Sequence, residues 1–94
     1  MIKLTKSERT RRFEILSTMR CCCCGAFDGI QIHHEPAGHG SRNDRRAVPL
    51  CYRCHETRHR PAPSQTRLAE MIRRTCEERA IEIDAVFAVE KIIG

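Results

Sequence analysis

Two pairs of cysteines with the same spacing are the residues most able to do chemistry. Cys21 and Cys24 form one Cys-x-x-Cys motif, and Cys51 and Cys54 form a second, with 26 residues between the motifs. Such a turn brings two thiolates to one ion, and two turns complete the tetrahedral four-sulfur coordination typical of structural zinc. A redox pair or accidental cysteines are the alternative. The spacing therefore predicts a closed Zn²⁺ site that holds the intervening loop at both ends.

Three further thiols have less certain roles. Cys22 and Cys23 fill the first motif, where they are either spectators or an alternative ligand pair. Cys76 lies on the apolar side of an expected helix, so we expect a small buried hydrophobic residue rather than a ligand.

All five histidines lie within 27 residues: His33, His34, His39, His55 and His59. Adjacent histidines on a strand point to opposite faces, so His33 and His34 cannot serve one ion in the same way. His55 and His59 stand four residues apart and share one face of an expected helix. We expect one histidine of the adjacent pair to join them around a divalent ion and the other to act as a general base on water. His39, between two glycines, is expected to be a loop residue.

Positive charge surrounds these histidines. Arginine supplies 14 of the 17 Lys and Arg residues, and the formal net charge is +5. Guanidinium groups bind phosphate in a bidentate manner. The candidate phosphate-binding residues are Arg42, Arg45, Arg46 and Arg58, with Arg53 and Arg60 nearby. An ion, a base and cationic side chains are the parts that phosphodiester hydrolysis needs. The alternative is a binding-only zinc module whose histidines are solvated or hold a structural metal.

The elements that must position these groups follow from the pattern of residues. We expect a basic N-terminal helix within 1–20, capped by Ser7. Residues 29–33 alternate like a strand, residues 47–50 form a second strand or the turn into a helix, and residues 52–59 suit that helix. Within residues 64–94 we expect two C-terminal helices, one capped by Ser64 and one beginning at Asp84. The expected fold class is α+β, with a ββα core in residues 21–60 of a single domain, 1–94.

Composition sets the remaining limits. Ninety-four residues with three Phe, one Tyr and no Trp make a small core that needs a staple. We see neither a signal peptide nor an apolar run long enough for a membrane span, so we expect a cytoplasmic chain without membrane contact. In that reducing compartment, cysteines serve as metal ligands more often than they form disulfides.

The stretch from Cys21 to His59 resembles the zinc-containing branch of the HNH (His-Asn-His) endonuclease superfamily. It is especially similar to small phage and prophage proteins related to the recombination-enhancement nuclease. The resemblance is carried by the knuckle Cys21-x-x-Cys24-Gly25, the pair His33-His34, the glycine-rich loop Gly38–Arg42, Asp44, the run Val48-Pro49-Leu50-Cys51, and then Cys54-His55 and His59. The match covers residues 21–60, under half of the chain.

The resemblance implies a ββα-metal (His-Me finger) core that hydrolyses DNA. It implies that His34 is the general base and that His33, His55 and His59 hold a catalytic cation such as Mg²⁺, Mn²⁺, Zn²⁺ or Ni²⁺. The central position of the family motif falls on Asn43 or Asp44, and we favour Asp44. The apolar stripe of the C-terminal helices either packs on the core or forms a homodimer. Further alternatives are a non-catalytic nucleic-acid adaptor and a protein-interaction zinc module.

Overall fold

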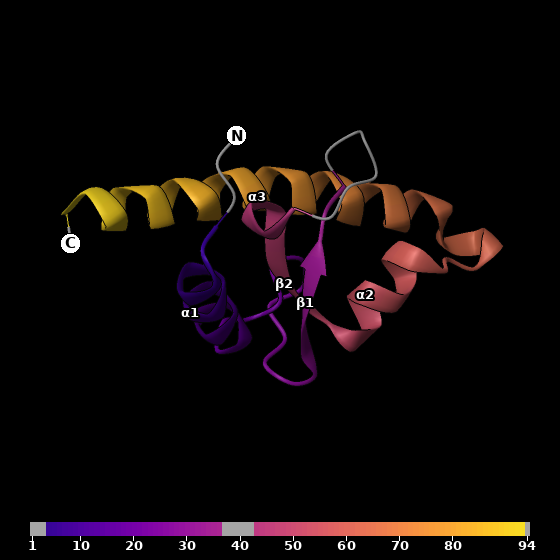
Figure 1. Cartoon of the computed structure of the whole chain (residues 1–94). Helices are drawn as coiled ribbons and strands as arrows, with labels where there is room; N and C mark the ends of the chain where they lie inside the picture. Colours follow the sequence, from indigo (N-terminus) through magenta and orange to yellow (C-terminus); the bar gives the residue numbers. More distant parts are fainter. Residues whose placement is uncertain (1–3, 37–42, 94) are drawn as a thin grey trace.

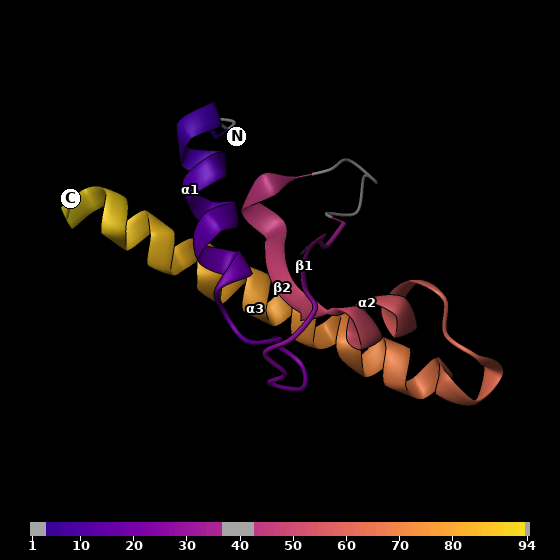
Figure 2. The same ribbon diagram turned by 90° about the horizontal axis from the view of Figure 1, so that it is seen from below.

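The computed structural model describes residues 4–36 and 43–93. Its elements, in chain order, are α1 (Lys6–Ser17), β1 (Ile30–His34), η1 (Asp44–Arg46), β2 (Ala47–Cys51), α2 (Tyr52–His59), η2 (Pro63–Gln65) and α3 (Thr66–Ile93). The fold is α+β, as expected. The long helix α3 crosses one side of a two-stranded hairpin, and α1 and α2 lie to either side of that hairpin (Figure 1, Figure 2).

Helix α1 begins with a capping box. The hydroxyl of Thr5 accepts a hydrogen bond from the backbone N–H of Glu8, and the Glu8 carboxylate accepts one from the N–H of Thr5, both at 3.1 Å. This reciprocal pair satisfies two of the orphan donors at a helix start. The cap predicted at Ser7 is therefore wrong, because Ser7 already lies in the first turn. The helix buries Arg12 and Leu16 against the rest of the fold.

The hairpin sets the geometry of the candidate site. β1 and β2 pair antiparallel, with Ile30 opposite Cys51 and His34 opposite Ala47. Both strands lie within one residue of their predicted positions, and residues 47–51 form a strand rather than a turn. Every residue of β2 is buried, whereas only His33 is buried in β1. The hairpin therefore carries one buried histidine, at the fourth of the five positions of β1.

Helix α2 spans the residues that the sequence predicts, and it follows β2 without a linker. Cys51 is the last residue of β2 and also the N-cap of α2, where its sulfur accepts a hydrogen bond from the N–H of Cys54 at 3.4 Å. The second Cys-x-x-Cys motif is thus the turn between strand and helix. This ββα succession places His55 and His59 on a helix that packs beside β1.

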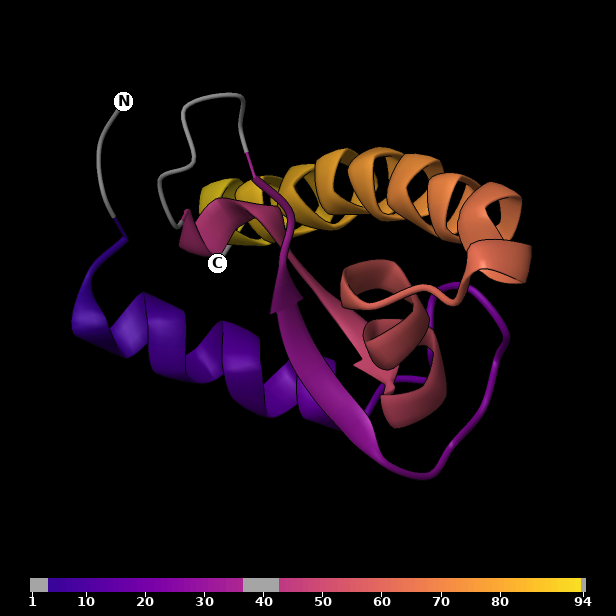
Figure 3. The ribbon, with the colours of Figure 1, turned by 90° about the vertical axis from the view of Figure 1, so that its right-hand side faces the viewer.

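Helix α3 is continuous over 28 residues, so the second helix predicted to begin at Asp84 is wrong. Asp84 lies inside α3, where its carboxylate binds the Arg12 guanidinium at 2.8 Å. Ser64 lies in η2 rather than at a helix cap, and the residue before η2 is Ala62. Figure 3 shows how α3 continues past the hairpin to lie over α1.

The core is small and rich in sulfur. Among the described residues, its main buried cluster consists of Val48, Leu50, Ile72, Ala80, Cys21, Cys51 and Cys76. Three of these seven residues are cysteines, so candidate metal ligands also supply a large part of the apolar packing.

Within the described residues, no helix is both long enough and apolar enough to cross a membrane.

Candidate metal centres

The four cysteines of the two Cys-x-x-Cys motifs come together. The sulfur atoms of Cys21, Cys24, Cys51 and Cys54 all lie within 4.8 Å of one another, and those of Cys24 and Cys51 are 3.6 Å apart. Four thiolates about 2.3 Å from a zinc ion stand at the corners of a tetrahedron with edges of about 3.8 Å. The cluster therefore has the composition and the spacing to hold a metal ion such as Zn²⁺.

Backbone geometry turns the first motif toward the second. Gly25 has φ +77°, a conformation that side chains disfavour. Its N–H donates to the carbonyl of Cys21 at 2.9 Å, and the N–H of Cys21 donates to the carbonyl of Ala26 at 2.9 Å. A residue with a Cβ at position 25 would strain this knuckle.

The thiols of this cluster affect one another's ionisation. Burial raises the pKa of Cys54 well above its ordinary value, and the neighbouring sulfurs of Cys51, Cys21 and Cys24 raise it further. For Cys21, burial opposes ionisation, but hydrogen bonds from backbone N–H groups, that of Cys51 first, outweigh it and lower the pKa to about 7. Four neighbouring thiolates repel one another, so all four can be ionised together only when a cation lies among them. A bound metal ion supplies that cation.

Three imidazoles form a second candidate centre. His33 comes from β1, and His55 and His59 come from α2; one ring nitrogen of each lies within 4.8 Å of the others. The ring centroid of His33 is 5.1 Å from each of the other two, which are 4.8 Å from each other. Burial, and then the charge of His33, lower the pKa of both helical histidines. Neutral imidazoles are the form that binds a metal, so this donor set suits a divalent ion such as zinc or nickel.

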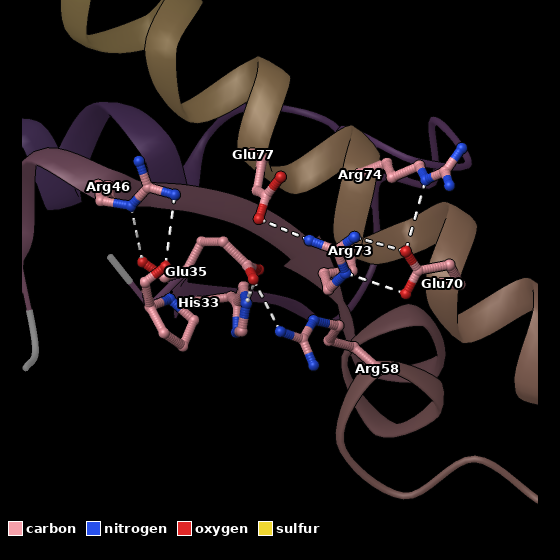
Figure 4. A network of polar contacts seen from close by, with 9 residues as sticks. His33, Glu35, Arg46, Arg58, Glu70, Arg73, Arg74 and Glu77 are labelled. Carbon is pink, nitrogen blue, oxygen red and sulfur yellow. Dashed lines mark hydrogen bonds and ion pairs between the residues drawn. The ribbon is translucent and has the colours of Figure 1, made fainter. Parts of the chain in front are cut away.

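A buried carboxylate stands behind His33 (Figure 4). Nε2 of His33 donates to Glu35 at 2.8 Å, and the guanidinium of Arg58 donates to the other carboxylate oxygen at 2.7 Å. Burial raises the pKa of Glu35, but the hydrogen bonds from His33 and Arg58 outweigh burial, so the pKa falls below its ordinary value. The ionised carboxylate keeps a proton on Nε2 of His33, and Nδ1 then faces His59 at 3.3 Å. Carboxylates orient metal-binding histidines in this way.

His34 lies in a different environment from His33. Its Nε2 is 2.9 Å from the Asp44 carboxylate, and its ring packs edge-on against Phe13 of α1 with centroids 5.7 Å apart. The strand thus presents its two histidines to different neighbours, as the alternation of side chains requires. Of the two candidates for the central position, Asp44 contacts His34, whereas the Asn43 side chain accepts a hydrogen bond from the N–H of Arg45 and caps η1.

The arginines expected near phosphate have protein partners. Arg58 binds the Glu35 carboxylate, and Arg46 donates to the backbone carbonyl of Glu35 at 3.0 Å. Arg45 lies 3.7 Å from the carboxylate of Asp84. Arg46 and Arg58 therefore hold the segment that carries Glu35, and their contact with phosphate stays a prediction. Arg42 lies outside the described residues, as does His39.

Two features of the site go beyond what the spacing of residues indicates. Glu35 was not among the predicted residues, although it stands two positions after His33 and so shares its face of the strand. Cys76 is fully buried, as expected, but its sulfur lies beside those of Cys22 and Cys23. These two cysteines therefore face α3 and not the four-cysteine cluster.

No family model, no curated protein and no solved structure matches this chain.

Proposed function

We propose that this protein is a metal-dependent DNA endonuclease with a ββα-metal core of the HNH type. The observation that supports the proposal most is the convergence of three imidazoles from β1 and α2, with Glu35 behind one of them. A second histidine, His34, adjoins this group in the chain and carries its own carboxylate partner, Asp44. Metal-assisted hydrolysis requires a metal ion and a general base, and adjacent positions of β1 supply a candidate ligand and a histidine with a carboxylate partner.

The two centres have different roles in this proposal. The four-cysteine cluster would hold Zn²⁺ with no open position and keep the knuckle attached to the hairpin. His33, His55 and His59 would hold a divalent cation through three nitrogens, which leaves positions open for oxygen ligands. When bound, that cation supplies positive charge to the phosphate and to the departing 3′-oxygen.

His34 would act as the general base. Asp44 accepts a hydrogen bond from Nε2 of His34 and so favours the tautomer with its proton on that nitrogen. Nδ1 is then the basic nitrogen and takes the proton from the attacking water. Asp44 also stabilises the imidazolium that forms, as a carboxylate behind a catalytic histidine does. This pairing is the reason for placing Asp44, rather than Asn43, in the supporting role.

DNA is the proposed substrate because the chain is basic near the histidines. Arg53 and Arg60 stand at the two ends of α2 and are both exposed. They join Arg42, Arg45, Arg46 and Arg58 as the candidates to contact the phosphate backbone. Contacts of this kind bind without reading sequence, and their strength falls steeply with salt.

The decisive experiment compares nicking of supercoiled plasmid by the wild type, by His34→Ala and by Glu78→Ala, a control on the exposed face of α3. Each protein is assayed with Mg²⁺, with Mn²⁺ and without added ion, after elemental analysis of its zinc content. We expect ion-dependent nicking by the wild type and the control. We expect a loss of about 10²- to 10⁴-fold in His34→Ala, the usual contribution of a general base.

Other outcomes point elsewhere. Plasmid binding that weakens with salt, without nicking under any ion, would favour the non-catalytic zinc-binding adaptor. Equal nicking by the wild type and His34→Ala at equal zinc content would remove His34 as the base. Dimerisation through α3 also stays a prediction, based on apolar side chains that the helix exposes, among them Leu68, Met71 and Ile81.

A further inference from the structure

The three cysteines outside the Cys-x-x-Cys ligand positions form a cluster of their own. The sulfurs of Cys22, Cys23 and Cys76 all lie within 4.8 Å of one another, and those of Cys22 and Cys23 are 3.9 Å apart. Two come from the knuckle and one from the middle of α3, 53 positions later in the chain. Three thiols from two separate elements therefore meet at one point in the fold.

The spacing of these sulfurs is that of a metal site. Three thiolates about 2.3 Å from an ion, arranged in a plane around it, are about 4.0 Å apart. The chain closes no disulfide among them, and the separation of Cys22 from Cys23 fits ligands of a shared ion. Within the described part of the chain, no fourth ligand atom lies as close to all three. Thiolate sulfur selects soft metal ions over magnesium or calcium.

The three-cysteine cluster is buried on the side of Cys76 and borders a cavity on the side of Cys22. Cys76 is fully buried on α3, so its sulfur is held in place by packing. Cys22 also lines a cavity of about 570 Å³ between α1 and α3, whose walls include Ile15, Ile83 and Phe87. An ion can thus approach the cluster from the side of Cys22, while Cys76 supplies a fixed ligand from inside.

We propose that Cys22, Cys23 and Cys76 form a second thiolate site, which binds one soft metal ion of the Cu⁺, Zn²⁺ or Cd²⁺ type. The thiols release their protons to solvent as the sulfurs bind the ion. Because the ligands come from the knuckle and from α3, the bound ion joins these two elements directly. The site shares no ligand with the four-cysteine cluster or with the proposed nuclease centre, although the sulfur of Cys76 also lies within 4.8 Å of ligand atoms of His33 and Glu35.

The test is a titration of the reduced full-length protein with ¹¹³Cd²⁺, followed by native mass spectrometry and cadmium NMR. Sulfur-bound cadmium resonates far from cadmium bound by nitrogen or oxygen, so the histidine centre is counted separately. Cys76→Ser removes one ligand. Ala80→Ser is the matched control, because it also buries a hydroxyl on the same face of α3 but leaves every thiol in place. A Cys22→Ser, Cys23→Ser double variant tests the cluster from its other side.

We expect two sulfur-bound cadmium ions per chain in the wild type and in Ala80→Ser. We expect one in Cys76→Ser and one in the double variant, in which the four-cysteine cluster is intact. A single sulfur-bound ion in the wild type would overturn the proposal, and so would two in the double variant. If Cys76→Ser does not fold, the double variant alone still tests the proposal.

Discussion

Glu35 is a buried carboxylate with two partners, the imidazole of His33 and the guanidinium of Arg58. Its side chain is 2% exposed, so an unpaired charge there would be costly. The pair of contacts keeps the carboxylate ionised and fixes the orientation of His33. Glu35 therefore acts on the metal centre through His33, as a positioning residue.

Replacing Glu35 by Gln should weaken metal binding at the histidine centre by about 10- to 100-fold, because the carboxylate behind His33 is lost. Calorimetric titration with Co²⁺ measures this, after the cysteine sites have been filled with Zn²⁺. Glu56→Gln is the control, because Glu56 is an exposed carboxylate on α2. Equal affinities in both variants would show that Glu35 only fills space.

Asp44 supports His34 as Glu35 supports His33. Under the proposed function, Asp44→Asn should slow plasmid nicking by up to the roughly 10²- to 10⁴-fold expected for loss of the base itself. The reason is that an amide does not stabilise the imidazolium. Initial rates at fixed zinc content measure the effect, with Asp28→Asn, an exposed position before β1, as the control. A larger loss in the control than in Asp44→Asn would contradict this role.

At the residue level, the sequence predicts the ligands better than it predicts their support. The sequence spacing of Cys21 and Cys24, and that of the two helical histidines, predicts which side chains converge, because a turn or a helix fixes their relative positions. Glu35 has no such signature, because its role depends on Arg58, which is 23 positions away. Cys76 is similar: its burial follows from the helical pattern, but its neighbours follow only from the packing of α3 on the knuckle.

At the level of elements, the contact between α1 and α3 depends on a charged residue in an apolar setting. The Arg12 side chain is 7% exposed, binds Asp84 at 2.8 Å and lies 4.6 Å from the centre of the Phe87 ring. Burying a guanidinium costs free energy because the charge loses its water, and the ion pair with a carboxylate offsets most of that cost. This ion pair therefore determines how firmly α1 docks.

Asp84→Asn should lower the free energy of unfolding by about 2 kcal/mol, toward the low end for a buried pair because Asp84 is about one-third exposed. Glu82→Gln is the matched control: it also removes a carboxylate of α3 from an arginine, but that pair with Arg79 is exposed and contributes less than about 1 kcal/mol. Urea unfolding in excess zinc measures both. Equal losses would mean that burial of Arg12 does not matter.

The same ion pair explains which elements the sequence could predict. The strands and α2 are short, and β2 meets α2 inside the second Cys-x-x-Cys motif, so their limits depend on local sequence and lie within one residue of prediction. The continuity of α3 is not local. Asp84 has the chemistry of a helix cap, and only its partner Arg12, 72 positions earlier, shows why a carboxylate stands in the middle of a helix.

For the whole molecule, the question is how a chain with four aromatic residues among Phe, Tyr and Trp builds a stable core. Only Val48, Leu50, Ile72 and Ala80 are purely apolar members of the buried cluster, and the other three are cysteines. A core of this size rarely stabilises a fold without a staple. Metal binding and folding should therefore be coupled.

Removing the metal should unfold the protein. The zinc-binding free energy in small zinc-stapled domains is about 10–16 kcal/mol, comparable to or above the stability of a domain of this size. We expect a strong chelator to abolish the cooperative thermal transition seen by circular dichroism, and added Zn²⁺ to restore it. Cys51→Ser should reproduce the loss, because Cys51 joins β2, α2 and the four-cysteine cluster. His55→Ala should keep the transition, because His55 belongs to the other centre. Elemental analysis confirms whether the chelated protein is free of metal. If the metal-free protein still melts cooperatively at an unchanged Tm, the apolar core alone is enough to stabilise the fold.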